Sequence, residues 1–188
     1  MAAGEVQSAN FISSDTAGSA EHYSFSLDGA FVSGLKAKYF FKGYKSSLAD
    51  SIIIRNSEFI NNGCTILDIA DEKEDKGYYN AEYIFIGHNQ FTNQSGALLN
   101  IYRGGSDEST LGPHLIFSHN KIENCNVPGA LIKLTGVQQT EIFSNNFSAC
   151  NPPGVLISYS DIVRARHYLG KNKLSNSGKI EEDKYVEH

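Results

Sequence analysis

The sequence has no tryptophan, one methionine, four prolines and only three cysteines among its 188 residues. The cysteines, Cys64, Cys125 and Cys150, form no Cys-x-x-Cys pair, and no histidine lies at a zinc-ligand spacing from them. An odd number of cysteines in a chain of this length argues against a small domain held together by disulfides, and the spacing argues against a zinc finger. We therefore expect three small buried thiols and no disulfide bond.

Excess positive charge and long apolar runs are also missing. The 16 Lys and Arg residues against 21 Asp and Glu residues give a formal net charge of −5. This charge argues against a general nucleic-acid binder and against a protein held on an anionic membrane. No apolar run approaches about 18 residues, the length of a membrane-spanning helix. The 17 glycines and the 40% of hydrophobic residues indicate instead a folded, turn-rich β protein.

A repeat runs through most of the chain. Each copy starts with a β-rich run, passes through an asparagine, and reaches an apolar anchor two or three positions later. The anchors are spaced 32, 31, 25 and 27 residues apart and are Phe59, Phe91, Ile122, Phe147 and Leu174. After each of the first four anchors comes a glycine that opens another strand: Gly63, Gly96, Gly129 and Gly154. Such short strands with one- or two-residue corners cannot reverse direction as hairpins do, so each copy forms one coil of a solenoid.

The repeat predicts an all-β fold, a right-handed parallel β-helix of about five to seven rungs. Inward residues of successive rungs should stack into an apolar column, for which we select Ile54, Ile86, Phe117 and Phe143. Asparagine suits the corners because it tolerates left-handed backbone and can hydrogen-bond the next rung. The corner residues are therefore expected to form a structural ladder: Asn56, Asn89, Asn120, Asn145 and Asn172.

The repeat also sets the expected domain boundaries. We assign residues 1–22 to an N-terminal extension or cap, 23–178 to the β-helix and 179–188 to a polar C-terminal tail. Within the less regular start, Phe25-Ser26-Leu27 and Tyr39-Phe40-Phe41 indicate one or two imperfect early rungs or a cap.

Two pairs of residues share the same place in neighbouring repeats. Cys125 and Cys150 each follow their anchor by three positions, so they should stack as inward thiols in adjacent rungs. His88 and His119 each precede a corner asparagine, so they should stack as outward imidazoles. A metal pair is the less favoured interpretation of the histidines because no third ligand is evident.

Two rungs carry insertions at the same corner, at residues 71–79 and 103–113. Adjacent rungs lie about 4.8 Å apart, so the insertions should lie side by side. Together they hold six acidic residues (Asp71, Glu72, Glu74, Asp75, Asp107 and Glu108) and the basic residues Lys73, Lys76 and Arg103. Carboxylate oxygens are the ligands that Ca²⁺ prefers, so this corner is either a calcium or sugar site or a solvated charged loop.

Several segments resemble polysaccharide lyase family six, the group of alginate lyases and chondroitinase B. The most specific are Asp75-Lys76-Gly77-Tyr78-Tyr79-Asn80 and Tyr102-Arg103-Gly104-Gly105. The likeness covers about residues 23–175 and is greatest to the second, C-terminal β-helix of the two-domain alginate lyases. It implies a secreted or periplasmic protein, an acidic polysaccharide as partner, and an N-terminal catalytic domain in the same parent chain.

The resemblance also implies a chemistry, β-elimination after removal of the C5 proton of a uronate. In the family a lysine is the base, an arginine assists, and Ca²⁺ held by acidic residues clamps the carboxylate. Those residues belong to the N-terminal β-helix, where a Glu-x-Glu strand is followed by Lys-Ser. This chain has Glu72-Lys73-Glu74 and a later Arg103 but lacks the Lys-Ser, so the catalytic roles are not transferred.

Three hypotheses remain open for the function of the chain. The chain is a non-catalytic domain supporting a lyase, a lyase complete in itself, or a carbohydrate-binding β-helix without chemistry. The candidate catalytic residues are Arg103 and Lys76, and the candidate substrate-binding residues are Arg103, Tyr102, His114 and Tyr79. The candidate calcium ligands are Glu72, Glu74, Asp107 and Glu108.

Overall fold

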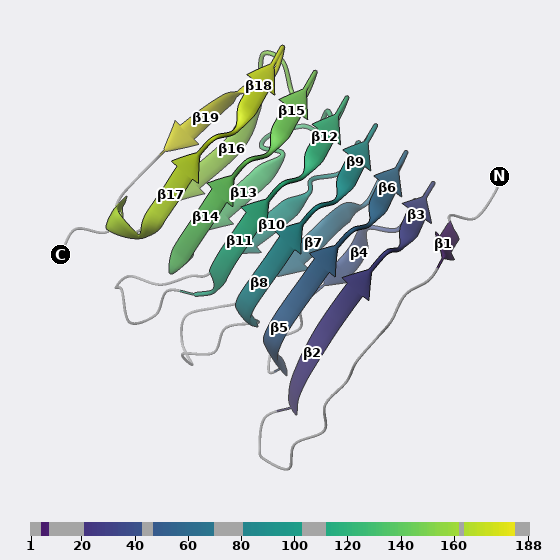
Figure 1. Cartoon of the computed structure of the whole chain (residues 1–188), viewed down its shortest axis with the longest axis vertical. Coiled ribbons are helices and arrows are strands. Elements are labelled where there is room, and N and C mark those ends of the chain that lie inside the picture. The colour runs from purple at the N-terminus through teal and green to yellow at the C-terminus, as the bar shows by residue number, and fades with distance from the viewer. Residues whose placement is uncertain are drawn as a thin grey trace.

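The structure is a computed structural model that describes residues 5–7, 21–42, 47–69, 81–102, 112–161 and 164–182. Within these ranges the regular secondary structure is β-strand, apart from one short 3-10 turn, η3 (Arg164–Arg166). The strands are assembled into three sheets that run side by side along the molecule (Figure 1).

The three sheets each take one strand from every turn of the chain. Sheet A has the order β1 (Glu5–Gln7), β3 (Phe31–Ser33), β6 (Glu58–Ile60), β9 (Gln90–Thr92), β12 (Lys121–Glu123), β15 (Asn146–Ser148) and β18 (Lys173–Ser175). Sheet B has the order β2 (Glu21–Asp28), β5 (Ser47–Arg55), β8 (Ala81–Gly87), β11 (His114–Ser118), β14 (Gln139–Phe143) and β17 (His167–Gly170). Sheet C has the order β4 (Tyr39–Lys42), β7 (Thr65–Ile69), β10 (Leu99–Tyr102), β13 (Ile132–Thr135), β16 (Val155–Ser160) and β19 (Lys179–Glu182).

The connectivity confirms the predicted parallel β-helix. A rung consists of one strand from sheet B, one from sheet A and one from sheet C, and each strand pairs in parallel with its counterpart in the next rung. From β2 to β17 the chain makes about five turns (Figure 1). The exception is β1, which pairs antiparallel with β3 at the N-terminal edge of sheet A.

The ends of the helix differ from the predicted boundaries. The first rung is complete, because β2, β3 and β4 use the two imperfect early segments around Phe25 and Tyr39. At the other end, β19 pairs in parallel with β16. The helix therefore extends to Glu182, four residues into the segment that the sequence assigned to a polar tail.

The core consists of stacked apolar columns. The anchor column is in register as predicted, and its members Phe59, Phe91, Ile122 and Phe147 are fully buried. The second column is Ile54, Ile86, Phe117 and Ile142, each five residues before its anchor. The choice of Phe143 for this column was wrong by one residue, because Phe143 pairs with Ser118 and is only half-buried on the outer face.

The asparagine ladder is present but starts one residue later than predicted. In each ladder position the asparagine Oδ1 accepts the backbone N–H of the residue at the same place in the preceding rung, at 2.9–3.0 Å. The asparagines are Asn89, Asn120, Asn145 and Asn172. In the first of these rungs Ser57, not Asn56, has this position, and its hydroxyl accepts the Ala30 N–H at 3.1 Å. Asn56 instead adopts left-handed backbone with φ of 51°, as do His88 and His119 at the equivalent positions.

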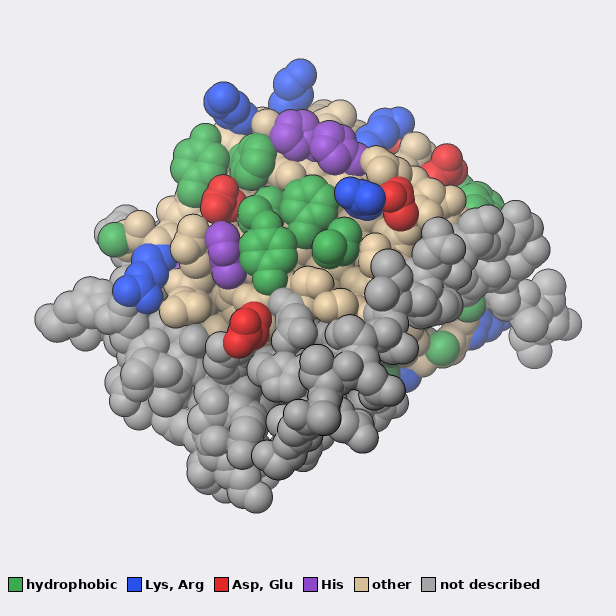
Figure 2. Space-filling model, turned by 60° about the horizontal axis from the view of Figure 1, so that its bottom comes forward, with side chains coloured by type: hydrophobic (Ala, Val, Ile, Leu, Met, Phe, Trp, Pro, Cys, Tyr) green, Lys and Arg blue, Asp and Glu red, His purple; other side chains and the backbone are tan. Residues whose placement is uncertain are grey.

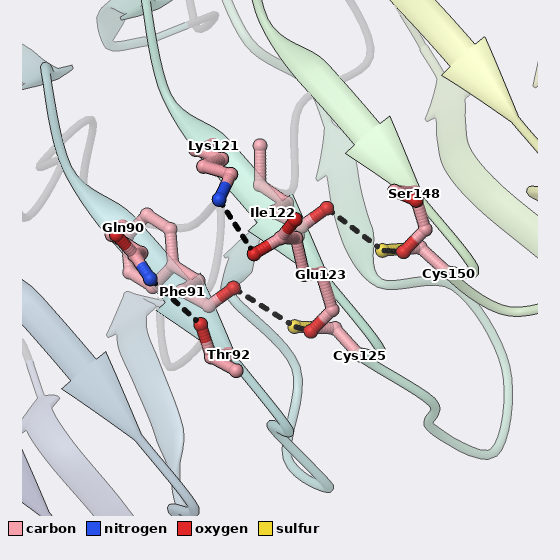
Figure 3. Close-up of polar contacts among 9 residues, drawn as sticks. All are labelled: Gln90, Phe91, Thr92, Lys121, Ile122, Glu123, Cys125, Ser148 and Cys150. Carbon is pink, nitrogen blue, oxygen red and sulfur yellow. Dashed lines mark hydrogen bonds and ion pairs between the residues drawn. The ribbon is translucent and has the colours of Figure 1, made fainter.

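A second ladder follows the anchors by three residues, at the opposite end of sheet A. Its members are Asn62, Gln94, Cys125, Cys150 and Ser177. All three cysteines are free and buried, which confirms the expectation of no disulfide. The Cys125 thiol donates to the Phe91 carbonyl at 3.6 Å and the Cys150 thiol to the Ile122 carbonyl at 3.4 Å (Figure 3). The hydrogen bond to Cys150 and burial together raise the pKa of Cys125.

Candidate functional site

Of the residues predicted to form a site, Tyr102 and His114 lie in the part of the chain that the structure describes. The other predicted residues lie outside the described residues: Arg103, Lys76, Tyr79, Glu72, Glu74, Asp107 and Glu108. Their proposed roles, and the calcium site, therefore stay predictions. Among the described residues no group of three or more His, Cys, Asp or Glu side chains could hold a metal ion.

Tyr102 and His114 belong to different sheets. Tyr102 ends β10 on the outside of sheet C, and 41% of it is exposed. His114 begins β11 in sheet B, with its ring 5.3 Å from that of Tyr83 and its Nε2 3.3 Å from Glu141 Oε1. Among the described residues, no hydrogen bond or ring contact joins the two side chains.

A different set of polar side chains forms a continuous column on the outside of sheet C. Strand residues alternate between the two faces of a sheet, so an outward position in one rung stays outward in the next. The parallel register aligns one such position across six strands: Lys42, Asp68, Asn100, Lys133, Ser158 and Glu181. Their neighbours along the strands include buried residues such as Leu67, Ile101 and Leu134.

A groove of about 440 Å³ runs beside this column. One wall carries the polar side chains of Asn100, Lys133, Ser158 and Glu181. The other wall carries short or apolar groups, those of Thr65, Ala97, Ala130 and Val155, with Pro128 and Gly129 at the rim. Beneath the groove two consecutive residues of the fourth rung, Leu131 and Ile132, are both fully buried. The groove thus has one polar wall and one apolar wall.

Among the described residues along the groove, Lys133 has no ion-pair partner. Asn100 Nδ2 donates to Asp68 Oδ2 at 3.2 Å, and the Lys179 ammonium lies 2.6 Å from Glu181 Oε1. Lys133 is exposed at the middle of the groove, and within the described ranges no carboxylate pairs with it. The centre of the groove is thus a place where an anionic group gains a charge-assisted hydrogen bond.

The sequence carries a signal for these residues outside its recognisable motifs. Asn100, Lys133 and Ser158 each follow a rung-opening glycine by four positions, at Gly96, Gly129 and Gly154. Each is the one polar residue in an otherwise apolar stretch of strand. A single polar residue repeated from rung to rung is a less conspicuous pattern than the acidic clusters at the insertion corner.

Comparison of the chain with protein-family models and with curated proteins found no match. No helix in the described ranges is both long and apolar enough to cross a membrane.

Proposed function

We propose that this chain is a non-catalytic β-helix that binds a uronate-containing polysaccharide, with alginate as the first choice, in the groove on sheet C. The observation that carries the proposal is the Lys133 ammonium, which has no ion-pair partner among the described residues and lies in the centre of a groove with one polar and one apolar wall. The resemblance to lyase family six supports the choice of polymer and an extracellular or periplasmic location. It also supports a catalytic lyase domain in the same parent protein as the partner.

The dimensions of the groove suit a linear sugar chain. From the rung of Thr65 to that of Glu181 there are four rung steps, which at about 4.8 Å each give about 19 Å. A 1,4-linked pyranose chain advances by a similar distance per sugar, so each sugar of a chain laid along the groove meets a similar set of groups. The apolar wall faces the C–H surface of the ring, and the polar wall faces its hydroxyl groups.

Lys133 gives the groove its preference for an acidic sugar. The carboxylate of a uronate can accept a charge-assisted hydrogen bond from the ammonium, while Asn100 and Ser158 on either side can bind hydroxyls. Lys133 is exposed, so water screens this interaction and its contribution is moderate. A neutral sugar chain would leave the ammonium in water and gain nothing from it.

Substitution of Lys133 tests the proposal directly. We expect Lys133→Met to weaken the binding of an alginate hexasaccharide by about fivefold to tenfold, near 1 kcal/mol, because the substitution keeps the length of the side chain and removes its charge. Isothermal titration calorimetry in low salt measures the difference. Added salt should weaken the wild type more than the variant.

The matched control is Lys121→Met on sheet A. Lys121 is also exposed, and its ammonium pairs with Glu123 at 2.9 Å, away from the groove. Its loss should leave the affinity unchanged. Equal weakening by the two substitutions would point to a general effect of net charge and contradict the proposed groove, as would the absence of any binding of the hexasaccharide to the wild type.

The isolated chain is expected to show no lysis of alginate or chondroitin sulfates with calcium present. A base for this elimination needs desolvation or cationic neighbours to lose its proton. Lys73 and Lys76 instead stand in a hydrophilic segment with four carboxylates, and arginine stays protonated. The ultraviolet absorbance of the unsaturated product follows the reaction. Sustained turnover that is abolished by Arg103→Ala would instead establish the insertion corner as an active site.

A further inference from the structure

The outer face of sheet B carries a second surface of distinct chemistry. One outward column reads Ile53, Phe85, Ile116, Glu141 and Tyr168 along successive rungs. Beside it runs the column of Tyr83, His114 and Gln139. Figure 2 shows hydrophobic side chains grouped at the centre of this face, with histidine and acidic side chains around them.

Two aromatic rings on this face lie over glycines. A Cβ at Gly87 would come within 2.5 Å of the Phe85 ring, and a Cβ at Gly170 would collide with the ring of Tyr168. Because each glycine has no side chain, the ring two residues before it can lie over the glycine backbone. The two aromatic–apolar–glycine triplets, Phe85-Ile86-Gly87 and Tyr168-Leu169-Gly170, occupy the same columns three rungs apart. Three rung steps of about 4.8 Å place them about 14 Å apart.

Hydrogen-bonding groups lie between the two rings. Glu141 is in the column between Ile116 and Tyr168, and its Oε1 is 3.3 Å from His114 Nε2 and 3.4 Å from Gln139 Nε2. The carboxylate is partly exposed, with 34% of its side chain accessible. Its remaining lone pairs can accept hydrogen bonds from hydroxyl groups.

We propose that this face is a second sugar-binding track, separate from the sheet C groove, in which Phe85 and Tyr168 support the pyranose rings of a neutral oligosaccharide. The sugar chain lies along the helix axis. Its C–H faces rest on the two rings and on Ile116, and hydroxyls of the sugars between them bind Glu141 and His114.

The size of the apolar strip favours a sugar chain over a protein. Ile53, Phe85 and Ile116 span two rung steps, about 10 Å, and the column on one side is polar. A stable protein interface covers about 800 Å² on each partner, far more than this strip. The strip matches one or two sugar rings.

The charges on this face favour a neutral sugar over a uronate. Glu141 is the carboxylate in the middle of the track and would repel the carboxylate of a uronate. At the other end of the face, the Arg55 guanidinium is already neutralised by Asp28 at 2.8 Å. The two faces of the helix therefore differ in the sugar class they select, so this inference stands or falls independently of the sheet C groove.

The experiment is a titration of the ¹⁵N-labelled chain with cellohexaose and mannohexaose, two neutral 1,4-linked probes. At least one of them should shift the amide signals of β8, β11, β14 and β17. Gly87→Ala should then weaken that binding by about fivefold or more, since the new methyl group displaces the Phe85 ring. The clash is with the free end of a side chain, and Gly87 has no left-handed φ, so the fold should be kept.

Four further measurements define the result. Gly63→Ala, where the new Cβ meets only ordinary contacts at 3.6 and 3.7 Å, should bind as the wild type does. Glu141→Gln keeps the shape and should also weaken the neutral sugar, which covers the case that Gly87→Ala fails to fold. Lys133→Met should leave neutral binding unchanged, and Gly87→Ala should leave alginate hexasaccharide binding in the groove unchanged.

The inference is overturned if neither neutral probe shifts the sheet B amides at millimolar concentration, or if Gly87→Ala and Glu141→Gln both bind as the wild type does. Concentration-dependent shifts of the same amides without sugar would identify a contact between copies of the chain and would also overturn it. If the wild type binds a neutral probe but not the alginate hexasaccharide, the result contradicts the sheet C groove and leaves this inference standing.

Discussion

Phe91→Ala is expected to lower the free energy of unfolding by about 3–5 kcal/mol, as truncation of a large core aromatic does. Phe91 is fully buried and lies in the anchor column between Phe59 and Ile122. Its ring stacks on that of Phe59 with centroids 5.1 Å apart and planes inclined by 17°. The substitution removes these contacts and leaves a cavity that rungs on both sides cannot close, because each rung is fixed by its ladder of backbone hydrogen bonds.

The matched control for Phe91 is Leu174→Ala in the same column. Leu174 belongs to β18 at the end of sheet A, and 45% of it is exposed. Its truncation should cost less than about 1 kcal/mol, since solvent fills the space. Urea unfolding curves measure both variants, with the slopes compared because repeat folds can lose cooperativity. A loss below about 1 kcal/mol for Phe91→Ala would show that packing in the anchor column contributes little to the stability of the fold.

The fold could be predicted because three independent features of the sequence mark the rung repeat. The apolar anchors, the corner asparagines and the rung-opening glycines recur at nearly constant offsets from one another. Each has its own physical cause: burial for the anchors, side-chain hydrogen bonds between rungs for the asparagines, and close approach or left-handed backbone for glycines such as Gly96 and Gly129. At Gly96, for example, an added Cβ would collide with the backbone of Cys64 in the previous rung. Agreement of three signals made the parallel β-helix predictable.

Errors of one residue occurred where two similar residues are adjacent. Asn56-Ser57 and Ile142-Phe143 each offer two candidates for one place in the rung. Composition cannot decide between them, because asparagine also suits the left-handed position and phenylalanine also suits an outer face. Counting back from the anchor resolves both cases, by two residues for the ladder and by five for the core column.

The candidate site was less predictable than the fold. The sequence drew attention to charge density at the insertion corner, and most of that corner lies outside the described residues. The groove depends on which outward residues share a column, and a column depends on register. Lys133 is an ordinary surface lysine until the pairing of β10, β13 and β16 aligns it with Asn100 and Ser158.

Asn145→Ala is expected to lower the free energy of unfolding by about 2–5 kcal/mol, because it leaves several buried polar groups without partners at once. Asn145 is 1% exposed. Its Oδ1 accepts the backbone N–H and the side-chain amide of Asn120 at 2.9 and 3.0 Å. Its Nδ2 donates to the Phe117 carbonyl at 2.9 Å and to Asn172 Oδ1 at 3.0 Å. Alanine can replace none of these bonds.

The neighbouring residue provides the control for Asn145. Asn146 is exposed, and only its backbone takes part in the described hydrogen bonds, through its N–H to the Asn120 carbonyl at 2.9 Å. Asn146→Ala should therefore change the free energy of unfolding by no more than about 0.5 kcal/mol. Two identical substitutions at adjacent positions then separate the ladder from the general preference of asparagine for corners. Equal effects in urea unfolding would show that the side-chain hydrogen bonds between rungs add nothing to stability.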